Sequence, residues 1–326
     1  MVPFLIRMWY TFYLAYTECA NVLLFLVYHT KDIHLLDTLV VTGSLPFEKY
    51  GPISLKTDDA LFNSLNGIIE NVKQEVLIRD IDPKKRRNQE LENAEKAERK
   101  HNKEEEKKDV IEQLKEIEQD PFRMELLTAL RSIRILGQIV KNENSGIKKD
   151  KIIEVLKQTY ITCFRIIGSF VTELQDKSGE IVQYIIDESN EKGRRIDTAK
   201  LRNDIGKLIG FLVYKFCLYN FSNLTHSVGT KDLDDIYDDV AVQIGTPAAK
   251  LVSFTIKSYY GKRMSISELE ELYDSFSNNP VAQQILRARA VHYVYHNTVG
   301  LADKQKIGNI CKLKLVDKAD LNKDKR

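Results

Sequence analysis

The stretch FRMELLTALRSIRILGQIVKN, residues 122–142, decides the fold class of this chain. Its large apolar residues recur every three or four positions, at Leu126, Leu127, Leu130, Ile133, Leu136, Ile139 and Val140. On an α-helix this spacing gathers them on one face, whereas a half-buried strand needs a period of two. The stretch therefore predicts a helix with one buried face, ended by the polar residues 142–146.

The same periodicity predicts further helices on both sides of this stretch. Asp32 is placed to cap the first of them, a break at 177–179 separates two others, and the apolar run ending at 228 is expected to be a central core helix. Only 15 Gly and 7 Pro occur, too few turn signals for a sandwich of many short strands. The expected helices cover 33–42, about 58–81, 149–175, 178–190 and 197–228.

Two helices near the C-terminus begin with the same pair of residue types. Thr246-Pro247 and Asn279-Pro280 each place a capping side chain before a proline suited to the first helical turn. The two prolines are 33 residues apart, close to the period of tetratricopeptide-like helical hairpins. Ser265 predicts the start of a further helix between them.

The fold class predicted from these patterns is all-α: an irregular, solenoid-like array of antiparallel helical hairpins with a charged connector. Residues 84–109 carry alternating charges and almost no large apolar side chain, so they are expected to be a solvated linker or exposed helix. A nucleic-acid or localisation patch at 84–87 is the alternative. Four segments follow: 1–83, an N-terminal helical segment interpreted as a remnant of a larger domain; 84–121, the charged linker; 122–316, a C-terminal helical domain; and 317–326, a frayed tail.

The apolar stretch at residues 2–29 is long enough to suggest a membrane span. Arg7, Glu18 and Asn21 interrupt it, and a carboxylate near the middle of a span is costly. A buried core helix is therefore favoured, a membrane segment is the alternative, and a secretory signal comes third because no small-residue cleavage site is evident.

Charge and cysteine usage favour a cytoplasmic protein. The formal net charge is only +2, so no strong field directs the chain to nucleic acid or to an anionic membrane. Neither a CxxC pair nor a Cys/His ligand spacing is present. We interpret the cysteines as small buried hydrophobic residues in a reducing compartment; they are Cys19, Cys163, Cys217 and Cys311.

Motifs for catalysis are missing from the sequence. It has no Walker A pattern, no Rossmann glycine pattern, no HExxH and no GxSxG. We therefore expect no enzyme activity and assign no catalytic, cofactor-binding or metal-binding residue and no cofactor.

Three clusters of polar residues have a possible functional meaning, but a structural role is favoured for each. An aspartate cluster could bind a cation, yet it lacks the glycine and terminal Glu of a calcium loop. His292 and His296 could be two metal ligands, but interior or semi-buried histidines are favoured. Arg287, Arg289 and His292 could contact a phosphate or an acidic partner, although a solvated helix face is favoured. The aspartates are Asp232, Asp234, Asp235, Asp238 and Asp239.

Across roughly residues 10–315 the chain resembles the C-terminal helical region of bacterial STAND nucleoside triphosphatases, large signal-transduction proteins of which several act in defence against phage. Residues 130–142, LRSIRILGQIVKN, resemble that family's TIEILGQILKN helix, which follows a charged connector. Residues 246–251, TPAAKL, are similar to a TPAxKLI segment, and the stretch from Asn279-Pro280 to Arg287 supports the match. The family's nucleotide-binding residues lie upstream of this region, and this chain has none of them.

The resemblance implies a detached tail: a gene fragment or a stand-alone partner of a separately encoded ATPase. The leading functional hypothesis is a non-enzymatic sensor or scaffold that binds a protein partner or relays a signal in bacterial defence. A membrane-associated effector using residues 2–29 is the alternative. A metal-dependent hydrolase using His292, His296 and the aspartate cluster is a remote third.

Overall fold

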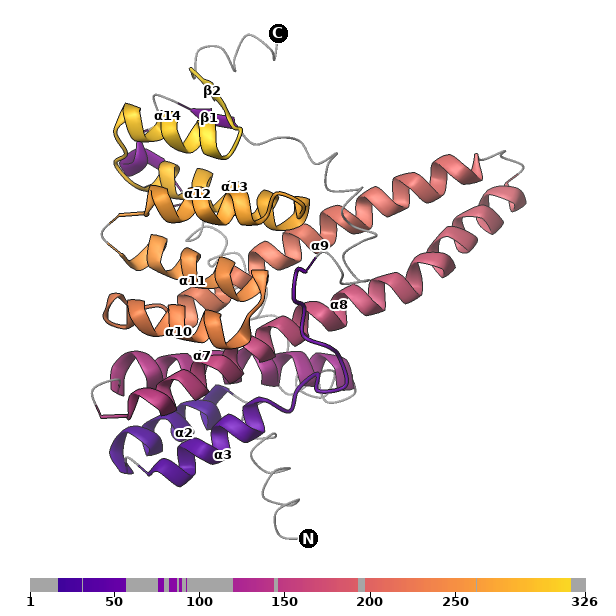
Figure 1. Ribbon diagram of the computed structural model, residues 1–326. Coiled ribbons are helices and arrows are strands. Elements are labelled where there is room, and N and C mark those ends of the chain that lie inside the picture. Colours follow the sequence, from indigo (N-terminus) through magenta and orange to yellow (C-terminus); the bar gives the residue numbers. More distant parts are fainter. Residues whose placement is uncertain are drawn as a thin grey trace.

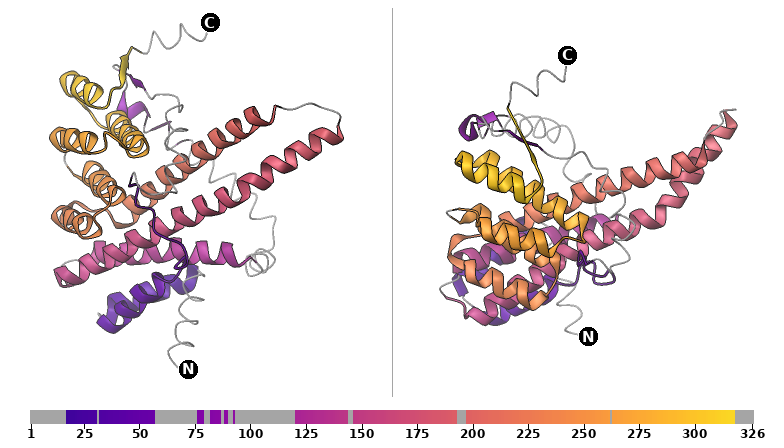
Figure 2. Two further views of the ribbon diagram at one scale, coloured as in Figure 1. Left: turned by 45° about the vertical axis from the view of Figure 1, so that its right-hand side comes forward. Right: turned by 45° about the horizontal axis from the view of Figure 1, so that its top comes forward.

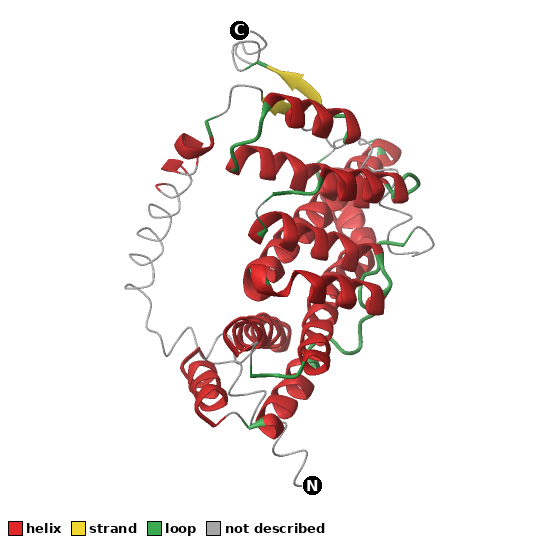
Figure 3. Cartoon of the chain, turned by 60° about the vertical axis from the view of Figure 1, so that its left-hand side comes forward, coloured by secondary structure: helices red, strands yellow, loops and turns green. Residues whose placement is uncertain are grey.

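A computed structural model of the chain describes residues 17–30, 32–56, 76–78, 82–86, 88–89, 92, 120–143, 146–192, 197–261 and 263–317. These residues are almost entirely helical, so the all-α fold class is confirmed (Figure 3). The helix expected from about residue 58, the first part of the N-terminal apolar stretch, most of the charged connector and the tail beyond 317 lie outside the described residues.

The helices stack on one another in nearly the order of the chain (Figure 1). From bottom to top in that view, α2 and α3 lie below α7–α9, which are followed by α10 and α11, then α12 and α13, and finally α14. The bounds are α2 Thr17–Thr30, α3 Ile33–Gly43, α7 Pro121–Glu143, α8 Lys149–Glu191, α9 Thr198–Val228, α10 Asp234–Ile244, α11 Pro247–Tyr260, α12 Ile266–Ser275, α13 Pro280–His296 and α14 Leu301–Ile310.

The predicted helix starts are confirmed at their capping residues. The Thr246 hydroxyl accepts a hydrogen bond from the backbone N–H of Ala249 at 3.3 Å, and Asn279 Oδ1 accepts one from Ala282 at 3.0 Å. Ser265 caps α12 in the same way. Each cap satisfies one of the N–H groups that a helix leaves unpaired in its first turn.

The prediction of two helices over 149–175 and 178–190 is wrong, because α8 is continuous through residues 177–179. A glycine inside a helix costs about 1 kcal/mol relative to alanine, which is too little to end a helix with long flanks. The Ser178 hydroxyl donates to the Gln175 carbonyl at 2.7 Å, so it is satisfied without leaving the helix.

Two short strands interrupt the helical pattern. β1 (Val76–Ile78) pairs in parallel with β2 (Lys314–Val316), and Leu77 at its centre is fully buried. The expected helix to about residue 81 is therefore wrong at its C-terminal end. A three-residue strand has too few positions to show its alternation, and its partner is far along the chain.

An extended segment, residues 51–56, crosses the stack and is named the strap here. Its start passes over Gly168 of α8, where a Cβ would lie 2.2 Å from the Gly51 carbonyl oxygen. The backbone N–H of Ile53 donates to the Phe164 carbonyl at 3.1 Å. This close approach of two backbones is possible because residue 168 has no side chain.

The strap ends against the N-termini of α11 and α13. The Ser54 carbonyl accepts from the N–H of Ala248 at 3.1 Å, and the Leu55 carbonyl accepts from the Asn279 side chain. Leu55 is buried with φ 57°, a strained value for a bulky residue. The strap joins the described part of segment 1–83 to segment 122–316, and the buried residues of both form one hydrophobic core.

Candidate functional site

The most distinctive surface of the molecule is a helical hairpin that leaves the stack (Figures 1 and 2). We call residues 172–191 of α8 and 198–212 of α9 the arm. Within it only Val182 and Gly210 are buried, whereas α8 before residue 172 and α9 after residue 212 are rich in buried side chains. At 1.5 Å per residue, the α8 half of the arm is about 30 Å long.

Apolar side chains are exposed on both helices of the arm. Tyr184 is 67% exposed and Leu208 57%, and Ile181, Phe211 and Leu212 are each more than 40% exposed. Exposed apolar residues that gather on one part of a protein surface mark interaction sites. The arm is therefore the candidate binding site.

The spacing on α9 places two of these exposed residues on one face with two half-buried ones. Leu201, Ile205, Leu208 and Leu212 follow one another at intervals of four, three and four, which aligns side chains along a helix. The prediction of a core helix over the whole of residues 197–228 is wrong for its first half: only the half after residue 212 is mainly buried.

The root of the arm is fixed by aromatic packing. The Phe170 and Phe216 rings stack with centroids 4.1 Å apart and an interplanar angle of 26°. Lys215 lies over the Phe211 ring at 5.4 Å from its centroid. The Phe170–Phe216 contact joins α8 to α9 at the point where they leave the stack, and the Lys215–Phe211 contact lies within α9.

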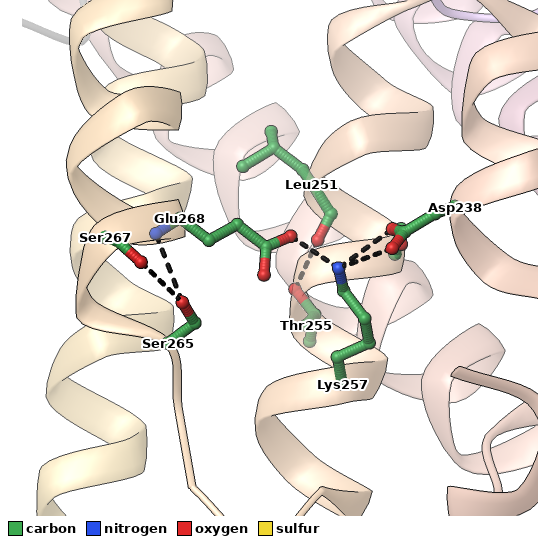
Figure 4. A network of polar contacts seen from close by, with 8 residues as sticks. Asp238, Leu251, Thr255, Lys257, Ser265, Ser267 and Glu268 are labelled. Atoms are coloured by element: carbon green, nitrogen blue, oxygen red, sulfur yellow. Dashed lines mark hydrogen bonds and ion pairs between the residues drawn. The ribbon is translucent and has the colours of Figure 1, made fainter. Parts of the chain in front are cut away.

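A cleft of about 700 Å³ lies between the end of α11 and the start of α12. At its edge, Lys257 Nζ lies 2.8 Å from Asp238 Oδ1 and 2.6 Å from Glu268 Oε1, so one ammonium joins three helices (Figure 4). Other lining residues are Lys231, Asp232, Asp234, Tyr260, Arg263 and Ser265.

The electrostatics of this cleft favour a structural role. Burial disfavours the charged form of Lys257, but the contacts with Asp238 and Glu268 outweigh it and raise the pKa of the ammonium. A lysine that acts as a nucleophile or base needs a lowered pKa. Lys257 is therefore suited to tying helices together and not to proton transfer.

The aspartate cluster does not converge on one point. Asp238 binds Lys257 and accepts from the Ser253 hydroxyl at 2.7 Å, while Asp239 pairs with Lys149 at 2.7 Å. Burial raises the pKa of Asp234. Within the described part of the chain, no group of three or more His, Cys, Asp or Glu residues is placed to hold a metal ion.

The expectation of interior or semi-buried histidines on α13 is confirmed for His296 and wrong for His292. His292 is exposed and His296 half-buried; their rings stack at 3.9 Å. His296 Nδ1 lies 2.7 Å from the His292 carbonyl oxygen, and the His292 ring also faces Tyr259 at 6.4 Å. They form an aromatic row with Tyr259.

Arg287 and Arg289 are not the solvated residues that the sequence analysis favoured. Both are half-buried. Arg287 Nε donates to the Cys311 carbonyl at 2.9 Å, and Arg289 Nη2 donates to the Leu218 carbonyl at 2.6 Å. Each guanidinium satisfies a main-chain acceptor of a neighbouring helix or turn, so these arginines hold α13 in the stack.

Three cysteines have the buried, unpaired state that was predicted. Cys163, Cys217 and Cys311 are free thiols inside the core. Burial raises the pKa of Cys217 to about 12 and that of Cys311 to about 12, and it raises the pKa of Cys163 further. A thiol with a raised pKa is a poor nucleophile. The side chain of Cys19 lies outside the described residues.

Comparison with protein-family models, with curated proteins and with solved structures finds no match to this chain. The resemblance to STAND nucleoside triphosphatases therefore stays a prediction. Among the described helices, none has the length and apolar character needed to cross a membrane.

Proposed function

We propose that this chain is a non-enzymatic helical scaffold that binds a protein partner through the arm. The observation that carries the proposal is the exposure of apolar side chains on both arm helices, with Leu208 the most exposed of those on α9. A surface of this kind loses water-exposed apolar area when a partner covers it, which favours association.

The architecture of the stack supports the same proposal. Stacked helical hairpins present extended surfaces to other proteins, and each layer contacts mainly its neighbours. The charged side chains of the stack are held by contacts within the stack. Lys257 pairs with two carboxylates, and Arg287 and Arg289 donate hydrogen bonds to main-chain carbonyls. The apolar side chains of the arm, in contrast, remain exposed to solvent.

For the identity of the partner, we propose a separately encoded STAND-type ATPase in a bacterial, cytoplasmic defence context. The resemblance of residues 130–142 and 246–251 to the helical tail of that family supports this choice. The missing phosphate-binding motif explains why an ATPase would have to be supplied by another chain.

The test is binding of the purified chain to the product of the neighbouring ATPase gene, with ADP, with ATP and without nucleotide. We expect binding in at least one nucleotide state, weakened by Leu208→Glu. The matched control is Val242→Glu, because Val242 is 77% exposed on α10 in the stack, away from the arm. No binding in any nucleotide state would contradict the proposal.

A membrane-associated role is the second candidate, and one observation favours it. Val22, Phe25 and Leu26 are exposed on α2, and Ile33 is exposed at the start of α3. Such a row could lie in the interface of a bilayer without crossing it. Flotation with vesicles tests this: the wild-type chain should float and Phe25→Glu should not. A wild-type chain that stays in the bottom fraction removes the candidate.

A further inference from the structure

We infer that the arm pairs with the arm of a second copy of this chain, α8 of each copy lying against α9 of the other. This inference rests on the proposed function, since it names one partner of the same surface. The four helices would form a bundle in which the exposed apolar residues of both arms become its core.

The hairpin of the arm leaves large apolar side chains exposed. Two helices can bury only the seam between them, and in the arm that seam buries Val182 alone among the large side chains described. Tyr184 on α8 and Leu208, Phe211 and Leu212 on α9 remain exposed. A second hairpin laid alongside completes the arrangement of four helices around one core.

The charges of the arm separate by helix. In the arm, residues 172–191 of α8 carry six carboxylates and one lysine, whereas residues 198–212 of α9 carry three basic residues and one aspartate. The acidic residues of the α8 half are Glu173, Asp176, Glu180, Asp187, Glu188 and Glu191, and the basic residues of the α9 half are Lys200, Arg202 and Lys207. No ion pair joins the two helices among the described arm residues; the pairs found there, Lys177–Glu173 and Lys192–Glu188, lie within α8.

This separation makes the arm complementary to itself. In a two-fold dimer, residue i of one copy contacts residue j of the other, and j contacts i. Placing α8 against α9 of the second copy brings acidic and basic helices together twice, whereas placing α8 against α8 would bring like charges together. Charge therefore favours the dimer in which α8 of one copy contacts α9 of the other, and it disfavours the dimer in which the two α8 helices meet.

The first experiment measures the mass of the full chain in solution by light scattering and by sedimentation over a range of concentrations. We expect a reversible dimer. Leu208→Glu should raise the dimer dissociation constant at least about tenfold, while Val242→Glu should leave it unchanged. A chain that is monomeric throughout the range, or a dimer that Leu208→Glu does not weaken, overturns the inference.

The second experiment uses charge exchange and does not depend on the stability of any one variant. The triple variant Glu180→Lys, Asp187→Lys, Glu188→Lys makes both arm helices basic, and Lys200→Glu, Arg202→Glu makes both acidic. Each should be monomeric alone, and an equimolar mixture should form a heterodimer. If the mixture stays monomeric, the inference fails. If the chain is a monomer that still binds the ATPase through Leu208, this inference fails while the proposed function stands.

Discussion

The carbonyl oxygen of Leu55 accepts a hydrogen bond from the side-chain amide of Asn279, which lies 224 residues further along the chain. The same side chain caps α13 through its Oδ1 atom, which accepts from the N–H of Ala282. Asn279 is buried, so both bonds are shielded from water. One amide therefore starts a helix and fixes the strap against the stack.

Replacing Asn279 by Asp separates these two roles. A carboxylate still accepts from Ala282, but it cannot donate to the Leu55 carbonyl and faces it oxygen to oxygen. We expect the free energy of unfolding to fall by about 2–3 kcal/mol, because a buried acceptor is left unpaired beside a buried charge. Urea denaturation measures the change. Ser265→Ala, which removes the cap of α12 and an exposed contact with the Ser267 hydroxyl, should cost about 1 kcal/mol. An Asn279→Asp midpoint equal to that of the wild type would show that the Leu55 contact contributes nothing.

Two glycines of the same helix should respond to alanine with opposite signs. At Gly168 a methyl group would lie 2.2 Å from the Gly51 carbonyl oxygen, so the strap or α8 has to shift. We expect Gly168→Ala to cost about 2–3 kcal/mol, in the range of overpacked core substitutions. At Gly179 nothing lies within 4 Å of the new methyl group, and alanine should stabilise the helix by about 0.5–1 kcal/mol. Thermal unfolding tests this: the midpoint should fall for Gly168→Ala and rise for Gly179→Ala. A midpoint shift in the same direction for both variants would contradict the close approach of strap and helix.

The helices were predictable where local chemistry determines them, and the strap was not. Thr246-Pro247 and Asn279-Pro280 start helices through their own side chains, which the sequence shows directly. Gly168, in contrast, resembles any other glycine in a helix. A glycine is needed at position 168 because the Gly51 carbonyl approaches it, and this approach exists only in the folded chain.

In the arm, too, the helices were predictable from the sequence, whereas the exposure of their apolar side chains was not. Helical periodicity predicted helices on both sides of residues 193–196, but it cannot tell whether an apolar face is covered by the same chain or left exposed. Leu208 and Leu212 were therefore assigned to a core helix. The weak signal that could have separated the two halves of α9 is its charge: Lys200, Arg202 and Lys207 all precede the half that is buried.

The ion-pair cluster around Lys257 predicts a pH dependence of stability. The pKa of Lys257 is raised in the folded chain, so its contribution is fully present below the unfolded value of about 10.4 and is lost as the pH rises through the folded value. Because Asp238 and Glu268 are partly exposed, we expect Lys257→Met to cost only about 1 kcal/mol at neutral pH.

The measurement is the difference in unfolding free energy between the wild type and Lys257→Met from pH 8 to 11.5. The difference should stay constant up to about pH 10 and shrink above it, as the ammonium loses its proton. Lys250→Met is the control on the same helix, since Lys250 is exposed and forms no ion pair with the described residues. If the difference in unfolding free energy between the wild type and Lys257→Met grew with rising pH, the cluster would not hold Lys257 in its charged form.

Removing the arm should leave the stack folded and abolish self-association. Deleting residues 176–210 and joining Gln175 to Phe211 through about four flexible residues is feasible, because packed helices lie about 8–10 Å apart and short loops connect antiparallel neighbours. An isolated helical hairpin is marginally stable, so the arm contributes little to the unfolding free energy of the monomer, and we expect a change of less than about 1 kcal/mol. The dependence of that free energy on urea should decrease, since less surface is exposed on unfolding.

Near-ultraviolet circular dichroism tests whether the stack of the deletion variant stays folded, and sedimentation tests whether self-association is lost. Loss of the folded stack would mean that the arm belongs to the core, and a deletion variant that still dimerises would place the contact between copies elsewhere.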